Sequence, residues 1–136
     1  MRTVFLDTSY LIALETSSDQ NHLAAETKWN AAFSQEPIQF VVTSFVFVEV
    51  ATLLNSRRQH QKAVDLGNHL LQSHFAKFIP VDQDMLLAGW SYFQRHGDKT
   101  YSLTDCISFV VMQQLGIRTA FTFDHHFQQA GFEVEP

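Results

Sequence analysis

The chain has 136 residues, of which 46% are hydrophobic and 17% charged, and its formal net charge is -5. This length predicts one domain, residues 1–136, with a single sizeable core, and the negative charge excludes a broad basic surface for nucleic acid. One cysteine excludes an internal disulfide. We expect a cytoplasmic protein with no secretory signal and no membrane span, because no apolar run approaches about 20 residues.

Apolar runs alternate with helical patterns along the chain. The predicted strands, in chain order, are residues 3–6, 38–42, 78–81, 119–123 and 132–134. Helices are predicted at residues 10–14, after Asp19, from 44 to 55, at 60–73, after Asp82, after Ser102 and as a short turn from His125. The predicted N-caps are Thr8 or Ser9, Asp19, Thr43 or Ser44, Asp82 and Ser102.

Two residues indicate how the later elements end. Pro80 lies in the third predicted strand and indicates an edge or distorted strand, because proline cannot donate to a neighbouring strand. Gly116 follows the Ser102 helix as a C-terminal cap. Strands that alternate with crossover helices predict a mostly parallel sheet covered on both faces, a three-layer α/β/α sandwich.

Four carboxylates stand at one kind of place in this pattern. Asp7 and Asp124 each follow an apolar strand, and Glu49 and Asp105 lie near the start of a predicted helix. In parallel α/β sheets ligands bind in the crevice beyond the carboxyl ends of the strands. If the first and fourth strands are neighbours, Asp7 and Asp124 lie side by side with the two helix starts above them.

Each acid also has an ordinary structural interpretation. Asp7 and Asp124 are placed to cap helices, and Asp105 lies three residues after Ser102, the spacing of a capping box. Glu49 is harder to explain in this way because its neighbours are apolar, and a carboxylate in such surroundings needs a partner.

A divalent metal explains the four acids together. Crowded carboxylates raise one another's pKa, and a bound cation reverses this effect. Sites built only from oxygen suit Mg²⁺ or Mn²⁺, which also bind substrate phosphates. The chemistry that follows is phosphodiester hydrolysis, in which the metal lowers the pKa of the attacking water and stabilises the leaving oxygen.

Further residues are candidates for supporting roles. Thr8, Ser9 and Thr104 are placed to orient water or phosphate, although each has an equally good interpretation as a helix-cap residue.

Arg95 and Lys99 flank the loop before the Asp105 helix and are candidates to contact RNA phosphates, with Lys99 preferred over a denser basic group that begins at Arg57. His125 and His126 do not match zinc spacing, and we expect at most one imidazole to contact a phosphate.

Four stretches of the chain resemble PIN-domain ribonucleases, and more narrowly the VapC toxins of bacterial and archaeal toxin-antitoxin pairs. The stretches are residues 4–9, 43–50, 101–106 and 120–127. Their order and spacing extend over nearly the whole chain, although none is decisive alone.

The resemblance implies a single PIN-like α/β/α domain and metal-dependent RNA cleavage, with Mg²⁺ or Mn²⁺ as cofactor. It assigns the catalytic and metal-binding roles to four acids, Asp7, Glu49, Asp105 and Asp124. It also implies a homodimer, a VapB-like antitoxin partner and a transfer or ribosomal RNA target.

Other functions remain open at this point. A haloacid dehalogenase-like phosphatase also begins with a strand that ends in Asp, but its second Asp would fall at Ser9. A response-regulator receiver needs a phosphoacceptor Asp after the third strand, and Asp82 fits that role poorly. A PIN nuclease of RNA processing or decay that has no antitoxin is an alternative, as is a catalytically silent PIN-like binding module.

Overall fold

The computed structural model describes residues 1–35, 37–72, 74 and 76–136. The described strands form one five-stranded sheet in the order β3-β2-β1-β4-β5, in which every neighbouring pair is parallel. They are β1 (Arg2–Leu6), β2 (Ile38–Thr43), β3 (Ala76–Ile79), β4 (Thr119–Phe121) and β5 (Glu133–Glu135).

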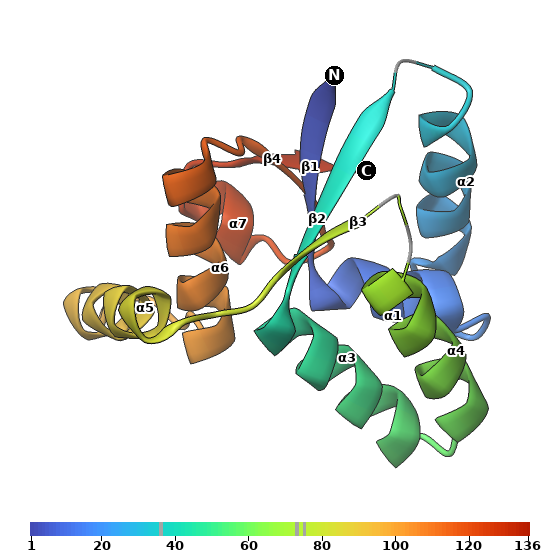
Figure 1. Ribbon diagram of the computed structural model, residues 1–136, viewed down its shortest axis with the longest axis horizontal. Helices are drawn as coiled ribbons and strands as arrows, with labels where there is room; N and C mark the ends of the chain where they lie inside the picture. The colour runs from blue at the N-terminus through green and yellow to red at the C-terminus, as the bar shows by residue number, and fades with distance from the viewer. Residues whose placement is uncertain (36, 73, 75) are drawn as a thin grey trace.

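Helices cover both faces of this sheet. They are α1 (Thr8–Glu15), α2 (His22–Ala32), α3 (Ser44–Ser56), α4 (His60–Gln72), α5 (Gln83–Arg95), α6 (Leu103–Leu115) and α7 (His126–Gln129). In Figure 1, α5, α6 and α7 lie on one side of the strands, and α1, α2 and α4 lie on the other. The predicted α/β/α sandwich is confirmed.

The centre of the sheet forms the core. Val4, Phe5 and Leu6 of β1 are at most 1% exposed, as expected for a strand with a parallel neighbour on each side and helices on both faces. Tyr10 of α1 is also buried and donates its hydroxyl to the carbonyl of Ala25 over 2.8 Å. This bond satisfies the one polar atom of a large core side chain.

Most helices begin at the N-cap residues that the sequence predicts. Thr43, Asp82 and Ser102 accept hydrogen bonds from backbone N–H groups three residues later, as predicted. Of the caps expected for α1, Asp7 is the one observed, because its carboxylate accepts from Ser9 N; the alternative cap at Thr8 or Ser9 is wrong.

The cap of α2 also differs from the prediction. Asn21, not Asp19, is its N-cap residue, and the Asp19 carboxylate accepts from the backbone N–H of Asn21 instead. Asp19 therefore stabilises the turn before the helix and not the helix end itself. The helix predicted at 60–73 is α4, and residue 73 lies outside the described residues.

Strand boundaries shift where tertiary pairing decides them. β3 begins at Ala76, ahead of the predicted run, because Ala76 and Lys77 pair with Phe40 and Val41 of β2. It is an edge strand and ends before Pro80, as the proline indicated. β4 ends at Phe121, and β5 lies one residue later than predicted.

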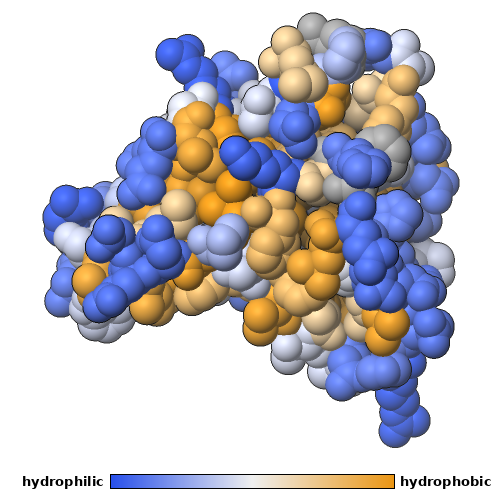
Figure 2. Space-filling model, viewed as in Figure 1, coloured by the Kyte–Doolittle hydropathy of each residue, from blue (hydrophilic) through white to orange (hydrophobic). Residues whose placement is uncertain are grey.

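The surface is unevenly hydrophobic. On the face shown in Figure 2, hydrophobic side chains gather over the α6 side of the sheet and near the start of α3, whereas hydrophilic side chains cover the α4 side. Among the described helices, none is both long and apolar enough to cross a bilayer.

Candidate functional site

The four predicted acids line one cleft of about 620 Å³ at the carboxyl ends of the strands. β1 and β4 are parallel neighbours, and the backbone N–H of Asp7 donates to the carbonyl of Phe121 over 3.2 Å. This pairing brings Asp7, which directly follows β1, and Asp124, which lies three residues beyond the end of β4, to the same cleft. Glu49 reaches the cleft from α3 and Asp105 from the first turn of α6.

Asp7 is held at the floor of the cleft by a set of short hydrogen bonds. Its Oδ2 atom accepts from the hydroxyls of Ser9 at 2.7 Å and Thr122 at 2.8 Å, and from Ser9 N at 3.3 Å. The side chain is 4% exposed. Burial raises its pKa to about 6 from 3.8 despite these bonds, because desolvation penalises the charged form more than the hydroxyls favour it.

Ser9 and Thr122 also fix the backbone that follows β4. The Ser9 hydroxyl accepts from Phe123 N, and the Thr122 hydroxyl accepts from Asp124 N, both over 2.9 Å. Each hydroxyl therefore donates to Asp7 and accepts from the loop that carries Asp124. The positions of the two acids are coupled through these side chains.

Asp105 combines a structural role with its place in the cleft. Ser102 and Asp105 form a capping box, in which Asp105 N donates to Ser102 Oγ at 3.0 Å and Ser102 N donates to Asp105 Oδ2 at 3.2 Å. Burial raises the pKa of the Asp105 carboxyl, and the nearby charge of Asp124 raises it further. Asp105 therefore caps its own helix, as the spacing predicted, and also lines the cleft.

Glu49 lies on a different face of α3 from the residues that enter the core. Val46, Val50 and Leu54 of that helix are buried. Glu49 and Leu53 line the cleft together with Arg57, which follows the last turn. Glu49 is half-buried. Its neighbours in the sequence are apolar, but its side chain lines the cleft, where it has polar surroundings.

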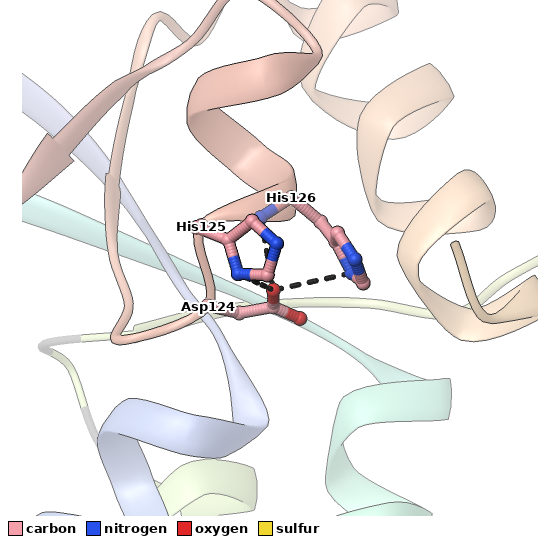
Figure 3. Close-up of side chains that lie close together, drawn as sticks. All are labelled: Asp124, His125 and His126. Atoms are coloured by element: carbon pink, nitrogen blue, oxygen red, sulfur yellow. Dashed lines mark hydrogen bonds and ion pairs between the residues drawn. The ribbon is translucent and has the colours of Figure 1, made fainter. Parts of the chain in front are cut away.

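His126 stands between two of the acids. Its Nδ1 atom lies 3.2 Å from Asp124 Oδ1 and 3.4 Å from Asp105 Oδ2, and its Nε2 atom lies 3.0 Å from the Thr100 hydroxyl. Figure 3 shows His126 and Asp124 turned toward each other. Asp124 Oδ1 also accepts from His126 N over 2.9 Å, which fixes the start of α7 against the carboxylate.

The residues predicted to support the acids are only partly brought to the site. Thr8 and Ser9 line the cleft, whereas Thr104, Arg95 and Lys99 are absent from the described residues that line it. Arg95 lies over the ring of Tyr92, and Lys99 is paired with Asp98 at 3.7 Å. Their roles remain predictions that this geometry does not favour.

Three residues that line the cleft or support its acids were missed or ranked low from sequence, namely Thr122, Arg57 and His126. Thr122 is polar within an otherwise apolar strand end directly before Asp124, which was a usable signal. Arg57 was set below Lys99, although its spacing of eight residues from Glu49 predicts the same helix face. His126 had no sequence signal beyond its closeness to Asp124.

The donor set of the cleft suits a divalent cation. Its carboxylate oxygens come from four separate segments of the chain. Among the described residues that line the cleft, Arg57 is the only lysine or arginine. Two buried polar atoms there, Thr8 Oγ1 and His126 Nδ1, have no hydrogen-bond partner within the described part of the chain. Orphaned polar atoms beside crowded acids are what a polar ligand or cation would satisfy.

Known proteins share both the sequence and the fold. A family model described as "PIN domain" matches residues 4–133. Over 134 residues the chain is 35% identical to the 23S rRNA-specific endonuclease VapC20 of Mycobacterium tuberculosis strain H37Rv, and the match covers 98% of each chain. The crystal structure of M. tuberculosis VapC20, described as a sarcin-ricin loop cleaving toxin, matches with a TM-score of 0.88 and 34% identity over 98% of this chain and 99% of that one.

More distant structures share the fold alone. A toxin-antitoxin complex from Klebsiella pneumoniae matches with a TM-score of 0.65 at 18% identity, over 98% of this chain and 96% of that one. VapBC2 from Rickettsia felis, bound to a promoter DNA fragment, matches with a TM-score of 0.69 at 10% identity, over 98% and 97% of the two chains. The chain therefore belongs to the PIN domain family and, within it, to the VapC-like nucleases.

Proposed function

We propose that this protein is a divalent-metal-dependent endoribonuclease that acts in the cytoplasm as the toxin of a VapBC-type pair. The observation that carries the proposal is the convergence of Asp7, Glu49, Asp105 and Asp124 on one cleft, in a chain 35% identical to a 23S rRNA-specific endonuclease over nearly its full length. Ribosomal RNA is the substrate class we propose first, and Mg²⁺ or Mn²⁺ the cofactor.

The four acids are proposed to hold the cation and to catalyse cleavage through it. A bound divalent cation supplies a water of lowered pKa as nucleophile and stabilises the leaving oxygen. The Ser9 and Thr122 hydroxyls keep the Asp7 carboxylate directed into the cleft. Burial raises the pKa of the Asp7 carboxyl to about 6, so near and below that pH metal binding is expected to release a proton from this residue.

Arg57 is proposed to contact an RNA phosphate. It is exposed, and it lines the same cleft as the acids. A guanidinium at the rim of an acidic cleft can hold a phosphate beside the metal, because its planar donors match phosphate oxygens. This placement gives the acidic protein a local site for RNA without a basic surface.

A homodimer and an antitoxin are the proposed protein partners. Four large hydrophobic residues of α5 are between 36% and 53% exposed, namely Leu86, Leu87, Trp90 and Phe93. Their spacing places them along one side of the helix, and contiguous exposed apolar residues of this kind mark interaction surfaces. We assign the dimer contact to this stripe, which leaves the acidic cleft accessible to RNA.

The proposed function is tested by incubating purified, partner-free protein with ribosomes and with total RNA in Mg²⁺ or Mn²⁺, and mapping the cut sites by primer extension. Cleavage at a few discrete sites is expected, with loss in a chelator and in Asp7→Asn. Asp19→Asn is the matched control, because Asp19 also lines the cleft but bonds the backbone of Asn21. Cleavage that persists in the chelator, or is lost equally in both variants, would contradict the proposal.

A further inference from the structure

The imidazole of His126 has a buried nitrogen that faces two carboxylates of the cleft. The Nδ1 atom has no hydrogen-bond partner among the described residues, although it lies 3.2 Å from Asp124 Oδ1 and 3.4 Å from Asp105 Oδ2. The side chain is 15% exposed. A buried polar atom without a hydrogen bond destabilises the fold, so the surroundings of Nδ1 require an explanation.

The other ring nitrogen indicates how the imidazole is oriented. Nε2 lies 3.0 Å from the hydroxyl of Thr100. When Nε2 donates its proton there, Nδ1 presents a lone pair toward the two carboxylates. Histidines that bind metals usually donate their second ring N–H to a polar partner in this way, which fixes the tautomer and the orientation of the ring.

The distances from Nδ1 to the two carboxylate oxygens are those between neighbouring ligands of one ion. Two ligands at right angles around a cation, each about 2.1 Å from it, lie about 3 Å apart. The distances from Nδ1 to Asp124 Oδ1 and Asp105 Oδ2, 3.2 and 3.4 Å, are close to this value. A lone pair facing two carboxylate oxygens is repelled by them unless a cation or a proton lies between.

We propose that Nδ1 of His126 is a nitrogen ligand of the divalent cation, alongside the carboxylates of Asp105 and Asp124. The inference rests on the proposed function, because the cation is the one that the nuclease is proposed to use. An imidazole ligand shifts the preference of an oxygen site from Mg²⁺ toward transition-metal ions. The site is therefore a mixed nitrogen and oxygen centre that binds Mn²⁺ more tightly than an all-carboxylate site would.

His125 provides a matched control for this assignment. Its side chain is 73% exposed, and its Nδ1 atom lies 3.9 Å from Asp124 Oδ1. One ligand atom from each of Asp124, His125 and His126 lies within 4.8 Å of the other two, so proximity alone does not distinguish the two histidines. The two histidines differ in that His126 is the more buried, and in that a second carboxylate, that of Asp105, faces His126.

The test is pulsed electron paramagnetic resonance of bound Mn²⁺, with binding measured by titration in parallel. We expect ¹⁴N modulation from a directly bound imidazole in the wild type and in His125→Gln, and its loss in His126→Gln. Wild-type protein labelled with ¹⁵N only at histidine should show the matching isotope shift, which requires no variant to fold. We also expect His126→Gln to lower Mn²⁺ affinity about tenfold or more, with a smaller effect on Mg²⁺.

The outcomes separate the inference from the proposed function. Bound Mn²⁺ without nitrogen modulation in the wild type would overturn the inference and leave the carboxylate site intact. Modulation lost in His125→Gln but kept in His126→Gln would overturn the assignment to His126. Failure of the wild type to bind Mn²⁺ or Mg²⁺ would overturn the proposed metal site itself.

Discussion

Thr122 donates a hydrogen bond to Oδ2 of Asp7 over 2.8 Å and accepts one from the backbone N–H of Asp124 over 2.9 Å. One buried hydroxyl therefore connects the ends of β1 and β4, the two strands whose following residues supply two of the four acids. Ser9 makes the same kind of connection to Phe123 N. The site is consequently organised by neutral hydroxyls as well as by its charges.

Replacing Thr122 with valine tests whether the Thr122 hydroxyl positions Asp7 and Asp124, because valine keeps the packing of the side chain but removes the hydroxyl. Valine keeps the shape but leaves the Asp124 N–H without its acceptor and Asp7 without one donor, so we expect a loss of about 1–3 kcal/mol in the free energy of unfolding. Mn²⁺ affinity should fall as well, because two acids lose their alignment. Thr122→Ser keeps the hydroxyl and is the control, and equal behaviour of the two variants in denaturant unfolding and metal titration would contradict the role.

The stability of Asp7→Asn should depend on pH in the metal-free protein. Burial raises the pKa of Asp7 to about 6 in the folded state, from 3.8, so the fold favours the protonated carboxyl. The stabilisation is complete below the unfolded value and is lost as pH rises through the folded one. Asn cannot ionise, so the variant should be more stable than the wild type by about 2–3 kcal/mol above pH 6.

Denaturant unfolding in chelator between pH 4 and 8 measures this difference. The advantage of Asp7→Asn should shrink as pH falls from about 6 toward 4. It should reverse when Mn²⁺ is added at neutral pH, because the wild-type carboxylate then gains its ligand. A variant less stable than the wild type at pH 7 without metal would show that the Asp7 site is not electrostatically strained.

The acids were predictable from sequence because their positions depend on local pattern. An apolar run that ends in Asp is visible in one dimension, and parallel strands place such ends at the same edge of the sheet. Their supporting partners depend on contacts between distant segments. Thr122 and Asp7 are 115 residues apart, and no periodicity in the sequence pairs them.

The errors at element boundaries have a similar cause. Asp7 both follows the first strand and caps α1, and the local pattern alone does not distinguish it as the cap from the hydroxyls of Thr8 and Ser9. Ala76 and Lys77 have little intrinsic strand preference and join β3 only because β2 offers hydrogen-bonding partners. Tertiary pairing overrode local propensity at these residues.

Arg57 and Lys99 can be compared directly as RNA contacts. In the cleavage-deficient Asp7→Asn background, Arg57→Gln should weaken RNA binding and lower the slope of log K against log salt by about 0.7–1, the change expected for one lost phosphate contact. Lys99→Gln should change the slope less, since Lys99 is paired with Asp98. Equal slopes for Arg57→Gln and for the Asp7→Asn protein without it would show that Arg57 does not contact RNA.

The α5 stripe makes a prediction about assembly. Trp90 is 46% exposed, and Trp90→Glu would bury a charge in the proposed dimer contact, so we expect the dimer dissociation constant to rise at least about tenfold. Val64→Glu is the control, because Val64 is 40% exposed on α4. Sedimentation equilibrium measures both variants, and a dimer lost only in Val64→Glu would place the contact on α4.

Gly89 determines how closely α5 approaches the helix that carries Asp105. A Cβ atom added at Gly89 would lie 2.5 Å from Cγ1 and 3.0 Å from Cα of Ile107 on α6. Because the Cα atom belongs to the backbone, Gly89→Ala must push the helices apart, and we expect it to lower the free energy of unfolding by about 1–3 kcal/mol. Gly97→Ala meets nothing within 4 Å and should be nearly neutral. Since α6 begins with the capping box of Asp105, Gly89→Ala should also weaken Mn²⁺ binding, whereas a destabilised variant with unchanged metal affinity would show that the first turn of α6 is held independently of α5.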